Sequence, residues 1–238
     1  MNTKPSKTPL ISCSSLRKTF GSKKQKIVAL DDISISLSGG GLTLLMGPSG
    51  SGKSSMISCL GGLQKPDGGH VYAFGEDLWS RRPRKINKFR REHCGFVFQS
   101  VGLFPALSAI EQIMLPLKYL GWNKKAARIS AQNALEEVGL GDRQFSRPSE
   151  MSGGQNQRVA IARMLAKTPQ LIFCDEPTSA LDGENGKRIA ELLKEAARKH
   201  NAMVMCVTHD ERLLPYADRV IQIDDGVVIS DTESGISV

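Results

Sequence analysis

The chain has 238 residues, 40% hydrophobic and 24% charged, a balance typical of one folded domain that excludes a disordered or collagen-like protein. Its 5% aromatic content argues against a ring-rich nucleic-acid surface, and its net charge of +8 suits an anionic membrane, a nucleic acid or a nucleotide equally. The longest wholly apolar run, 202–207, is far shorter than the roughly 20 residues of a spanning helix, and no apolar leader opens the chain, which predicts a cytoplasmic protein.

The first part of the chain predicts a loose tail followed by short strands. Residues 1–9 are polar and contain two prolines, so we expect a flexible N-terminal tail before a single domain over residues 10–238. A glycine cluster at 39–41 then leads into an apolar run that predicts a buried strand. The strands predicted here cover residues 11–16, 26–30, 33–37 and 42–46.

A phosphate-binding loop is indicated directly after the last of these strands. Residues 47–54 match the GxxxxGKS pattern and precede a helix-like segment at 54–60, which disfavours the alternative of a flexible glycine turn. Glycines let backbone N–H groups fold around phosphate oxygens, and the helix N-terminus adds its positive dipole end. Lys53 suits the β- and γ-phosphates, and Ser54 suits Mg²⁺. The predicted phosphate-binding residues are Gly47, Pro48, Ser49, Gly50, Ser51, Gly52, Lys53 and Ser54.

A dense cluster of basic residues precedes a short strand predicted at 95–98. Such a run is most often a solvated face, while anionic lipid headgroups, an acidic patch on a partner and nucleic acid are the alternatives. The cluster consists of Arg81, Arg82, Arg84, Lys85, Lys88, Arg90 and Arg91.

Residues 100–150 predict an inserted helical lobe, because helical periods broken by glycines and a proline replace the strand patterns. The lobe is followed by the sequence Ser152-Gly-Gly-Gln155, which precedes a helix-like stretch at 156–165. A hydroxyl and free backbone N–H groups at a helix N-terminus form an anion site that has no lysine of its own. A simple helix start is the alternative.

An apolar strand ending in two carboxylates, at 171–176, has the form of a Walker B segment. Asp175 is suited to hold Mg²⁺ through water, and Glu176 to polarise an attacking water as general base. Further apolar runs at 202–207 and 220–223 alternate with a helical pattern that begins at Ile189. Strands alternating with helices predict a mostly parallel sheet that is covered on both faces.

The cysteines form no recognisable framework. They are odd in number, widely spaced and contain no CxxC pair, which fits neither disulfides nor a zinc site. We therefore interpret them as reduced core thiols: Cys13, Cys59, Cys94, Cys174 and Cys206.

The order and spacing of these motifs resemble those of ABC ATPases from about residue 11 to 229. The resemblance makes Gln99 the Q-loop glutamine, which senses Mg²⁺ and the membrane partner, and makes 151–155 the signature motif with Met151 in place of the usual leucine. His209 resembles the switch histidine that contacts the γ-phosphate. The remaining carried-over binding residues are Phe20 for the adenine, Ser55 for the α-phosphate, Ser152, Gly153, Gly154 and Gln155 of the signature, and Asp182 of the D-loop at 179–182.

The resemblance implies an α/β P-loop NTPase fold with a mostly parallel core sheet, an N-terminal antiparallel β subdomain and an α-helical subdomain inserted at about 100–150. It implies ATP and Mg²⁺ as ligands, catalytic roles for Glu176, His209 and Gln99, and metal binding by Ser54, Gln99 and Asp175. It further implies a homodimer around two ATP that drives a separate membrane-spanning permease at the inner face of the membrane. The stretch 96–117 is similar to the lipoprotein-releasing and macrolide-exporting branch.

Two other functions share some of these motifs. A non-transport ABC ATPase acting on nucleic acid would carry two cassettes, a coiled-coil insertion or zinc modules, and the sequence has none of these. A nucleotide kinase would share the phosphate loop but has no need of the SGGQ segment. The cargo is left open, because the permease selects it.

Overall fold

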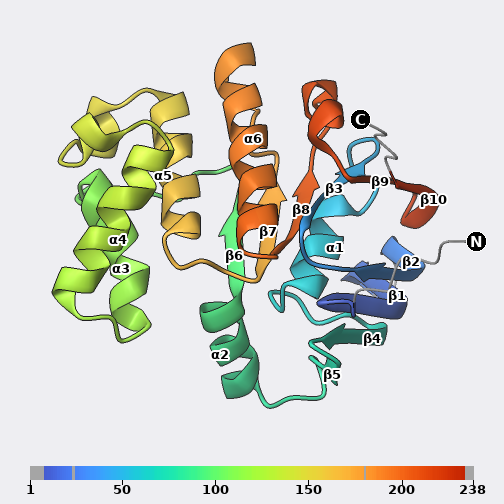
Figure 1. Ribbon diagram of the computed structural model, residues 1–238. Helices are drawn as coiled ribbons and strands as arrows, with labels where there is room; N and C mark the ends of the chain where they lie inside the picture. Colours follow the sequence, from blue (N-terminus) through green and yellow to red (C-terminus); the bar gives the residue numbers. More distant parts are fainter. Residues whose placement is uncertain (1–7, 23–24, 180, 234–238) are drawn as a thin grey trace, which may run out of the picture.

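The core of the protein is a six-stranded sheet with the order β10-β9-β3-β8-β7-β6. The computed structural model describes residues 8–22, 25–179 and 181–233. All neighbouring strands of this sheet run parallel except β9 and β10, which confirms the mostly parallel core that the sequence predicts (Figure 1). The strands are β3 (Gly41–Met46), β6 (Cys94–Val97), β7 (Leu171–Asp175), β8 (Met203–Val207), β9 (Arg219–Asp224) and β10 (Val227–Glu233).

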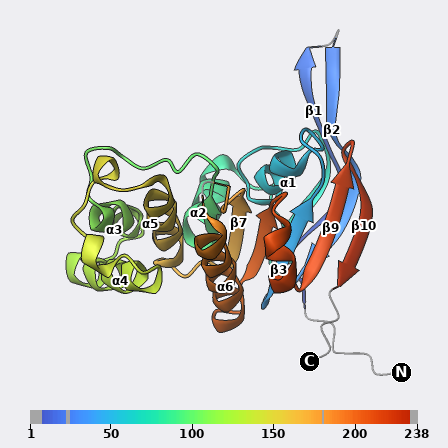
Figure 2. The ribbon, with the colours of Figure 1, turned by 90° about the horizontal axis from the view of Figure 1, so that it is seen from above.

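A second, four-stranded sheet is antiparallel throughout and has the order β2-β1-β4-β5. This confirms the antiparallel N-terminal β subdomain. Its strands β1 and β2 form a long hairpin that projects beyond the rest of the molecule (Figure 2). The strands are β1 (Ile11–Ser22), β2 (Gln25–Leu37), β4 (Gly68–Ala73) and β5 (Glu76–Asp77).

One strand prediction in this sheet is wrong. The two strands predicted at 26–30 and 33–37 are one continuous strand, β2. The pair Asp31-Asp32 has the composition of a turn, but the register of β1 against β2 shifts here, with Leu16 opposite Ile33 and Lys18 opposite Leu30. Asp32 has a φ of 55°, so the extra residue is absorbed in a bulge without breaking the ladder.

The helices divide into two groups. α1 (Lys53–Leu60), α2 (Pro83–His93) and α6 (Gly183–Lys199) pack around the core sheet, whereas α3 (Ala109–Tyr119), α4 (Lys124–Glu137) and α5 (Gly153–Leu165) pack on one another to one side (Figures 1 and 2). Three short 3₁₀ helices connect these elements: η1 (Gly141–Arg143), η2 (Pro148–Glu150) and η3 (Glu211–Tyr216). No helix within the described ranges is long and apolar enough to span a bilayer.

The core sheet separates two hydrophobic clusters, because successive side chains of a strand point to opposite faces. Along β3, Leu42 and Leu44 pack with α6 and the α3–α5 group, while Leu45 packs with α1 and the antiparallel sheet. The five cysteines are buried and unpaired. Burial raises the pKa of the Cys174 thiol to about 12, so the thiol stays protonated and serves as a core residue.

Candidate functional site

The loop between β3 and α1 is held in a conformation that only glycine can adopt at two positions. Gly47 has a φ of 148° and Gly52 a φ of 100°. A Cβ at Gly47 would lie 2.0 Å from the carbonyl oxygen of Ile223, and one at Gly52 would lie 2.0 Å from that of Ala29. The loop is therefore packed directly against the backbones of β9 and β2, which fixes its path at the carboxyl edge of the sheet.

Lys53 begins α1 and lies over this loop. Its Nζ donates to the carbonyl oxygens of Gly47 at 2.9 Å and Pro48 at 2.6 Å. No side chain caps the N-terminus of α1, so its first backbone N–H groups and the lysine charge are both directed to the loop. This is the arrangement that an oligophosphate requires.

Two carboxylates stand beside the loop at the end of β7. Asp175 is the last residue of the strand, and Glu176 follows with a φ of 51° and an N–H that donates to the carbonyl oxygen of Val207 at 2.9 Å. The Nδ1 atom of His209 lies 2.8 Å from Oε1 of Glu176. Glu176 Oε2 is buried without a hydrogen-bond partner among the described atoms, so one acceptor of this carboxylate is left for a ligand or a water.

These groups converge on one open cleft of about 610 Å³. Ser54, Gln99 and Asp175 offer oxygen ligands to this cleft. Such a set fits Mg²⁺ that is also bound by phosphate oxygens, rather than a metal ion bound by protein ligands alone. No group of three or more His, Cys, Asp or Glu able to hold a metal occurs in the described part of the chain. The cleft is lined by Phe20, Ile27, Ala29, Gly47, Pro48, Ser49, Gly50, Gly52, Lys53, Ser54, Ser55, Gln99, Asp175, Glu176, Val207 and His209.

The apolar end of the cleft contains residues that the motifs did not single out. Ile27 is 68% exposed, pairs with Phe20 across the β1–β2 hairpin, and lines the cleft beside it. Phe20 is 40% exposed, with the Lys18 ammonium 5.6 Å from its ring centroid. Pairing of the two strands could have revealed Ile27 from the sequence, since a hairpin around residues 22–25 puts Ile27 opposite Phe20.

Several predicted binding residues lie outside the cleft. Ser51 is buried, with 3% of its surface exposed, and its carbonyl oxygen accepts a hydrogen bond from the N–H of Gly226 at 3.2 Å. Asp182 caps α6, accepting from the N–H of Asn185 at 2.9 Å, and this hydrogen bond lowers the pKa of the Asp182 carboxyl. Residue 180 of the expected D-loop and residues 1–7 of the expected tail lie outside the described residues.

The SGGQ segment starts α5 and is also absent from the cleft. Ser152 Oγ accepts from the Gln155 N–H at 3.2 Å, and Gln155 Oε1 accepts from the Ser152 N–H at 2.9 Å, which forms a capping box. A Cβ added to Gly153 would meet nothing within 4 Å, so the space in front of this helix start is open.

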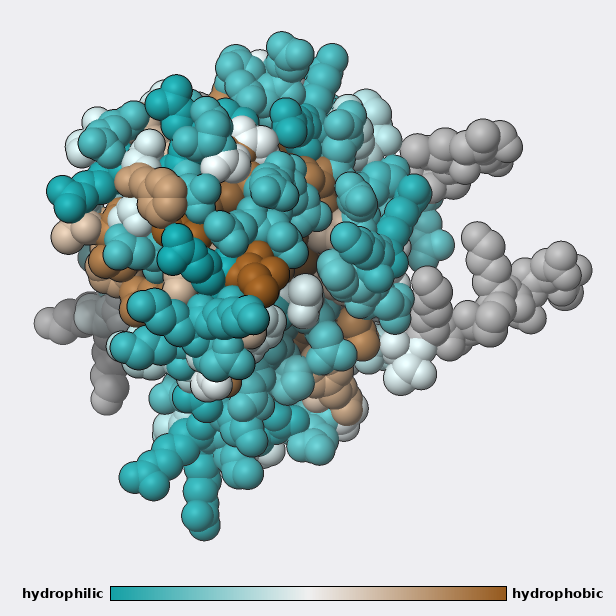
Figure 3. Space-filling model, turned by 60° about the vertical axis from the view of Figure 1, so that its left-hand side comes forward, coloured by the Kyte–Doolittle hydropathy of each residue, from teal (hydrophilic) through white to brown (hydrophobic). Residues whose placement is uncertain are grey.

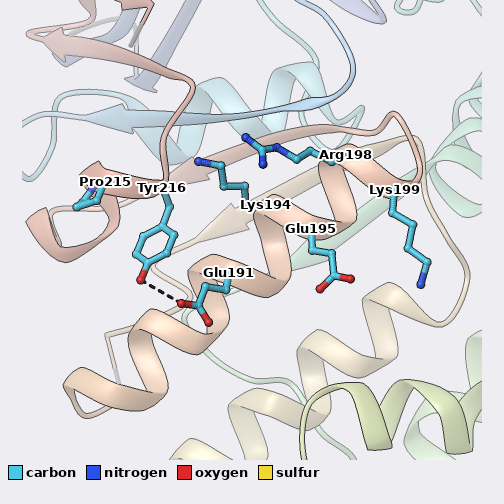
Figure 4. Close-up of a pocket in the computed structure, with 7 residues that line it drawn as sticks. All are labelled: Glu191, Lys194, Glu195, Arg198, Lys199, Pro215 and Tyr216. Carbon is cyan, nitrogen blue, oxygen red and sulfur yellow. Dashed lines mark hydrogen bonds between the residues drawn. The ribbon is translucent and has the colours of Figure 1, made fainter. Parts of the chain in front are cut away.

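A second large cleft, between α6 and η3, has no comparable chemistry. It mixes cationic and anionic side chains such as Lys194, Arg198 and Glu195, and Tyr216 donates to Glu191 Oε1 at 3.3 Å (Figure 4). None of the described residues that line it is a glycine or belongs to the start of an α-helix, so it does not compete with the loop cleft as a nucleotide site.

Fold and cleft together define a P-loop NTPase of the α/β class. The chain belongs to the ABC transporter family, since the family model described as ABC transporter matches residues 30–179. The macrolide export ATP-binding/permease protein MacB of Shewanella sp. (strain ANA-3) is 39% identical over 223 residues, covering 94% of this chain and 34% of the relative. An uncharacterised ABC transporter ATP-binding protein of Mycobacterium tuberculosis is 41% identical over 194 residues, covering 82% of this chain and 58% of the relative.

The solved structures agree with these relatives. The dimeric post-hydrolysis structure of the ATP-binding cassette MJ0796, bound to ADP and Pi, matches with a TM-score of 0.88 at 35% identity, covering 94% of this chain and 98% of that one. The resemblance to ABC ATPases, with macrolide-export relatives, is thereby confirmed. The chain spans about a third of the length of the MacB relative, 34%.

Proposed function

We propose that this protein is the ATP-hydrolysing subunit of an ABC transporter, built as one domain over residues 10–238 with a helical subdomain inserted at about 100–150. The observation that carries the proposal is the convergence of a phosphate loop, Asp175, Glu176 and His209 on one cleft from the ends of neighbouring strands. The macrolide export relatives support a role in export, and we include lipid or lipoprotein extraction within that proposed role.

The residues of the cleft divide the work of phosphoryl transfer to water. The loop N–H groups and Lys53 bind the phosphates and orient the γ-phosphoryl group. Glu176 accepts a proton from the attacking water at its unpaired Oε2, and His209, held against Oε1, fixes the carboxylate beside the γ-phosphate. Ser54, Gln99 and Asp175 would hold Mg²⁺, which when bound neutralises charge that develops on the phosphate oxygens.

The remaining predicted ligands act from a second copy. Ser152 to Gln155 and Asp182 do not line the cleft of their own chain, yet the start of α5 is an exposed anion site without a lysine. A homodimer in which each cleft faces the α5 start of the other copy encloses two ATP molecules. The dimeric MJ0796 cassette supports this arrangement.

The partner that converts closure into transport is a permease in a separate chain, which holds the subunit at the cytoplasmic face of the membrane. The name of the MacB relative joins an ATP-binding part with a permease in one protein, and this supports a permease as the partner without bearing on whether it is a separate chain. A non-transport ABC ATPase on nucleic acid and a nucleotide kinase remain the competing functions.

The test is to assay the purified protein with Mg²⁺ and ATP. We expect ADP and phosphate in equal amounts, and we expect Lys53→Ala to lose nucleotide binding while Lys187→Ala, an exposed lysine on α6, keeps it. Phosphate transferred to a nucleotide acceptor would favour the kinase. Hydrolysis that rises with DNA or RNA, and not with the co-purified permease, would favour the nucleic-acid function.

A further inference from the structure

The basic cluster of the sequence forms one surface on and beside α2. The helix lies at the lower end of the molecule in Figure 1, and the same end in Figure 3 is covered by hydrophilic side chains that extend into solvent. Ile86 and Phe89 are its buried residues, and Arg84, Lys85, Lys88 and Arg91 are exposed. The surface adjoins a shallow cleft of about 650 Å³ lined by Phe74, Glu76, Arg81, Arg82, Lys85, Lys88, Phe89, Glu92 and His93.

Part of this positive charge is used inside the protein. Arg90 donates to the carbonyl oxygen of Gly62 at 3.1 Å and to Asn87 Oδ1 at 2.6 Å, so it ties α2 to the end of α1. Arg81 pairs with Glu76 at 2.8 Å. These contacts explain two of the cations as structural.

The cations at the start of α2 differ from those at its end, because they have no ion-pair partner in the described part of the chain. Glu92 lies 3.9 Å from both Lys88 and Arg91, at the far end of α2. In the described part of the chain no carboxylate lies within ion-pair distance of Arg82, Arg84 or Lys85, and all three are exposed. Three unpaired cations on a helix N-terminus repel one another and the helix dipole, so an external anionic surface stabilises them.

An exposed aromatic ring accompanies these cations. Phe74 is 36% exposed, has a φ of 52°, and its ring packs edge-on against Phe89 with 6.3 Å between centroids. Its backbone N–H donates to the carbonyl oxygen of Leu10 at 2.9 Å, which holds the strand end that carries the ring. A fixed apolar ring that lines one cleft with Arg82 and Lys85 suits the boundary between lipid headgroups and acyl chains better than it suits a nucleic-acid backbone.

The C-terminal end of α2 adjoins an apolar groove beside Phe104, where we place the proposed permease. The C-terminal end of α2 is joined to the α5–β7 turn, because Lys167 Nζ donates to the carbonyl oxygen of Arg91 at 3.3 Å and His93 lies 2.9 Å from Gln170 Oε1. Lys167 in turn lines an apolar groove of about 320 Å³ that contains Phe104 and Tyr119. A permease seated in that groove brings α2 to the membrane side of the subunit.

We infer that α2 docks directly on the anionic lipid headgroups of the membrane through Arg82, Arg84 and Lys85, with Phe74 at the headgroup boundary. The inference rests on the proposed function for its orientation, but the contact itself needs neither ATP nor the permease. It gives the subunit a membrane contact of its own, in addition to its hold on the permease.

The test is co-sedimentation of the whole protein with vesicles of phosphatidylcholine alone or mixed with phosphatidylglycerol. We expect binding only to the anionic vesicles, weakening as salt is raised. Arg84→Gln combined with Lys85→Gln should lower the partition coefficient about 30-fold, since each basic side chain near an anionic surface contributes about fivefold. Both changes lie in the first turn of α2, where loss of positive charge does not oppose helix formation.

The matched control is Lys187→Gln combined with Lys199→Gln, which removes the same charge from exposed positions of α6. Equal losses in the two double variants would overturn the inference, because the attraction would then be diffuse. It would equally be overturned if the α2 variant bound vesicles normally but lost duplex DNA or the purified permease. ATP hydrolysis is measured alongside, so failure of the lipid contact is distinguished from failure of the ATPase assignment.

Discussion

The helices α1 and α5 both have glycine at their starts, and they differ in how their first backbone N–H groups are satisfied. At α1 no side chain caps the helix, Lys53 lies over the loop, and strand ends bring carboxylates to the same cleft. At α5 the capping box of Ser152 and Gln155 satisfies the Gln155 N–H and leaves the helix start exposed. The first start has a lysine and carboxylates of its own chain beside it, whereas the second offers backbone N–H groups without a lysine, as expected if α5 contributes to a site on another copy.

The glycines of the two helix starts sharpen the contrast. A Cβ at Gly52 would lie 2.0 Å from the carbonyl oxygen of Ala29, whereas a Cβ at Gly153 would meet nothing within 4 Å. Gly52 is therefore required by the fold, and Gly153 is not. If Gly153 is required at all, the reason lies in something that approaches from outside the chain.

The largest effect is expected from Glu176→Gln, in the cleft at the start of α1. The variant keeps the shape of the cleft and its phosphate contacts but cannot accept a proton, so hydrolysis should fall by about 10²–10⁴-fold with ATP binding retained. Single-turnover hydrolysis and nucleotide binding are measured together, with Glu137→Gln, an exposed residue of α4, as control. A wild-type rate would remove Glu176 from the role of base.

Gly153→Asp tests the second helix start. A carboxylate in the first turn suits the helix dipole, so the fold should be unchanged, but it repels a phosphate of the partner's ATP. We expect the loss of a preorganised anion site to slow hydrolysis about 10²–10³-fold. Sedimentation should show that Glu176→Gln dimerises with Mg²⁺ and ATP, whereas the double variant that carries both Glu176→Gln and Gly153→Asp stays monomeric. A monomeric Glu176→Gln protein under these conditions would contradict the shared site.

Mixing the two inactive variants makes the comparison sharper. In a heterodimer of Glu176→Gln and Gly153→Asp, one cleft combines both defects and the other combines an intact Glu176 with an intact α5 start. With random pairing into symmetric dimers, up to about a quarter of the wild-type activity should return. Sites confined to one chain would give no recovery at any mixing ratio.

The first helix start could be predicted from the sequence in most of its parts. The glycine loop, Lys53 and the carboxylates after β7 are local patterns, and the carboxyl ends of parallel strands meet at one edge, so their convergence follows from the motif order. The dihedral angle of Glu176 could not be predicted, because it depends on the hydrogen bond of its N–H to Val207 on the neighbouring strand. The burial of Ser51 likewise depends on a long-range contact, with Gly226.

The periphery was harder to predict. Ile27 lines the cleft because β1 and β2 pair as one long hairpin, whereas the sequence predicts two separate strands at 26–30 and 33–37. For the basic cluster, sequence gives the charge but not the pairing. Only the structure separates Arg90, which is bound to Gly62, from Arg84, which has no carboxylate within ion-pair distance among the residues that the structure describes.

Phe104→Asp tests the segment that follows Gln99 in the sequence. This segment is bonded to α5, because Arg163 of that helix donates to the carbonyl oxygens of Gly102 at 2.8 Å and Val101 at 3.1 Å. Phe104 is 54% exposed and lines the lobe groove, so it is not a core residue of the lobe. We expect the variant to fold and bind ATP, but to lose stimulation by the permease about tenfold, as expected for loss of a buried aromatic anchor.

The matched control for this variant is Phe145→Asp, since Phe145 is 66% exposed on the same lobe. Equal loss in both variants would mean that the lobe responds to charge in general. Normal co-purification and stimulation of Phe104→Asp would place the coupling contact elsewhere on the subunit.

The smallest effect is expected at Asp210, which follows His209 of the cleft in the sequence. Its carboxylate accepts from Arg212 Nε at 2.7 Å and Thr178 Oγ1 at 2.9 Å, and the hydrogen bonds from Arg212 are the main cause that lowers the pKa of this carboxyl below 3.8. A lowered folded-state pKa contributes stability that is present above pH 3.8 and is lost as the pH falls through the folded value. Asp210→Asn should therefore cost about 1–3 kcal/mol at pH 7, and this difference should shrink below pH 4. Urea unfolding at both pH values measures it, with the exposed Asp142→Asn as control. A difference that stays constant with pH would mean that the carboxylate charge contributes nothing, and that Asp210 holds the turn after His209 by shape alone.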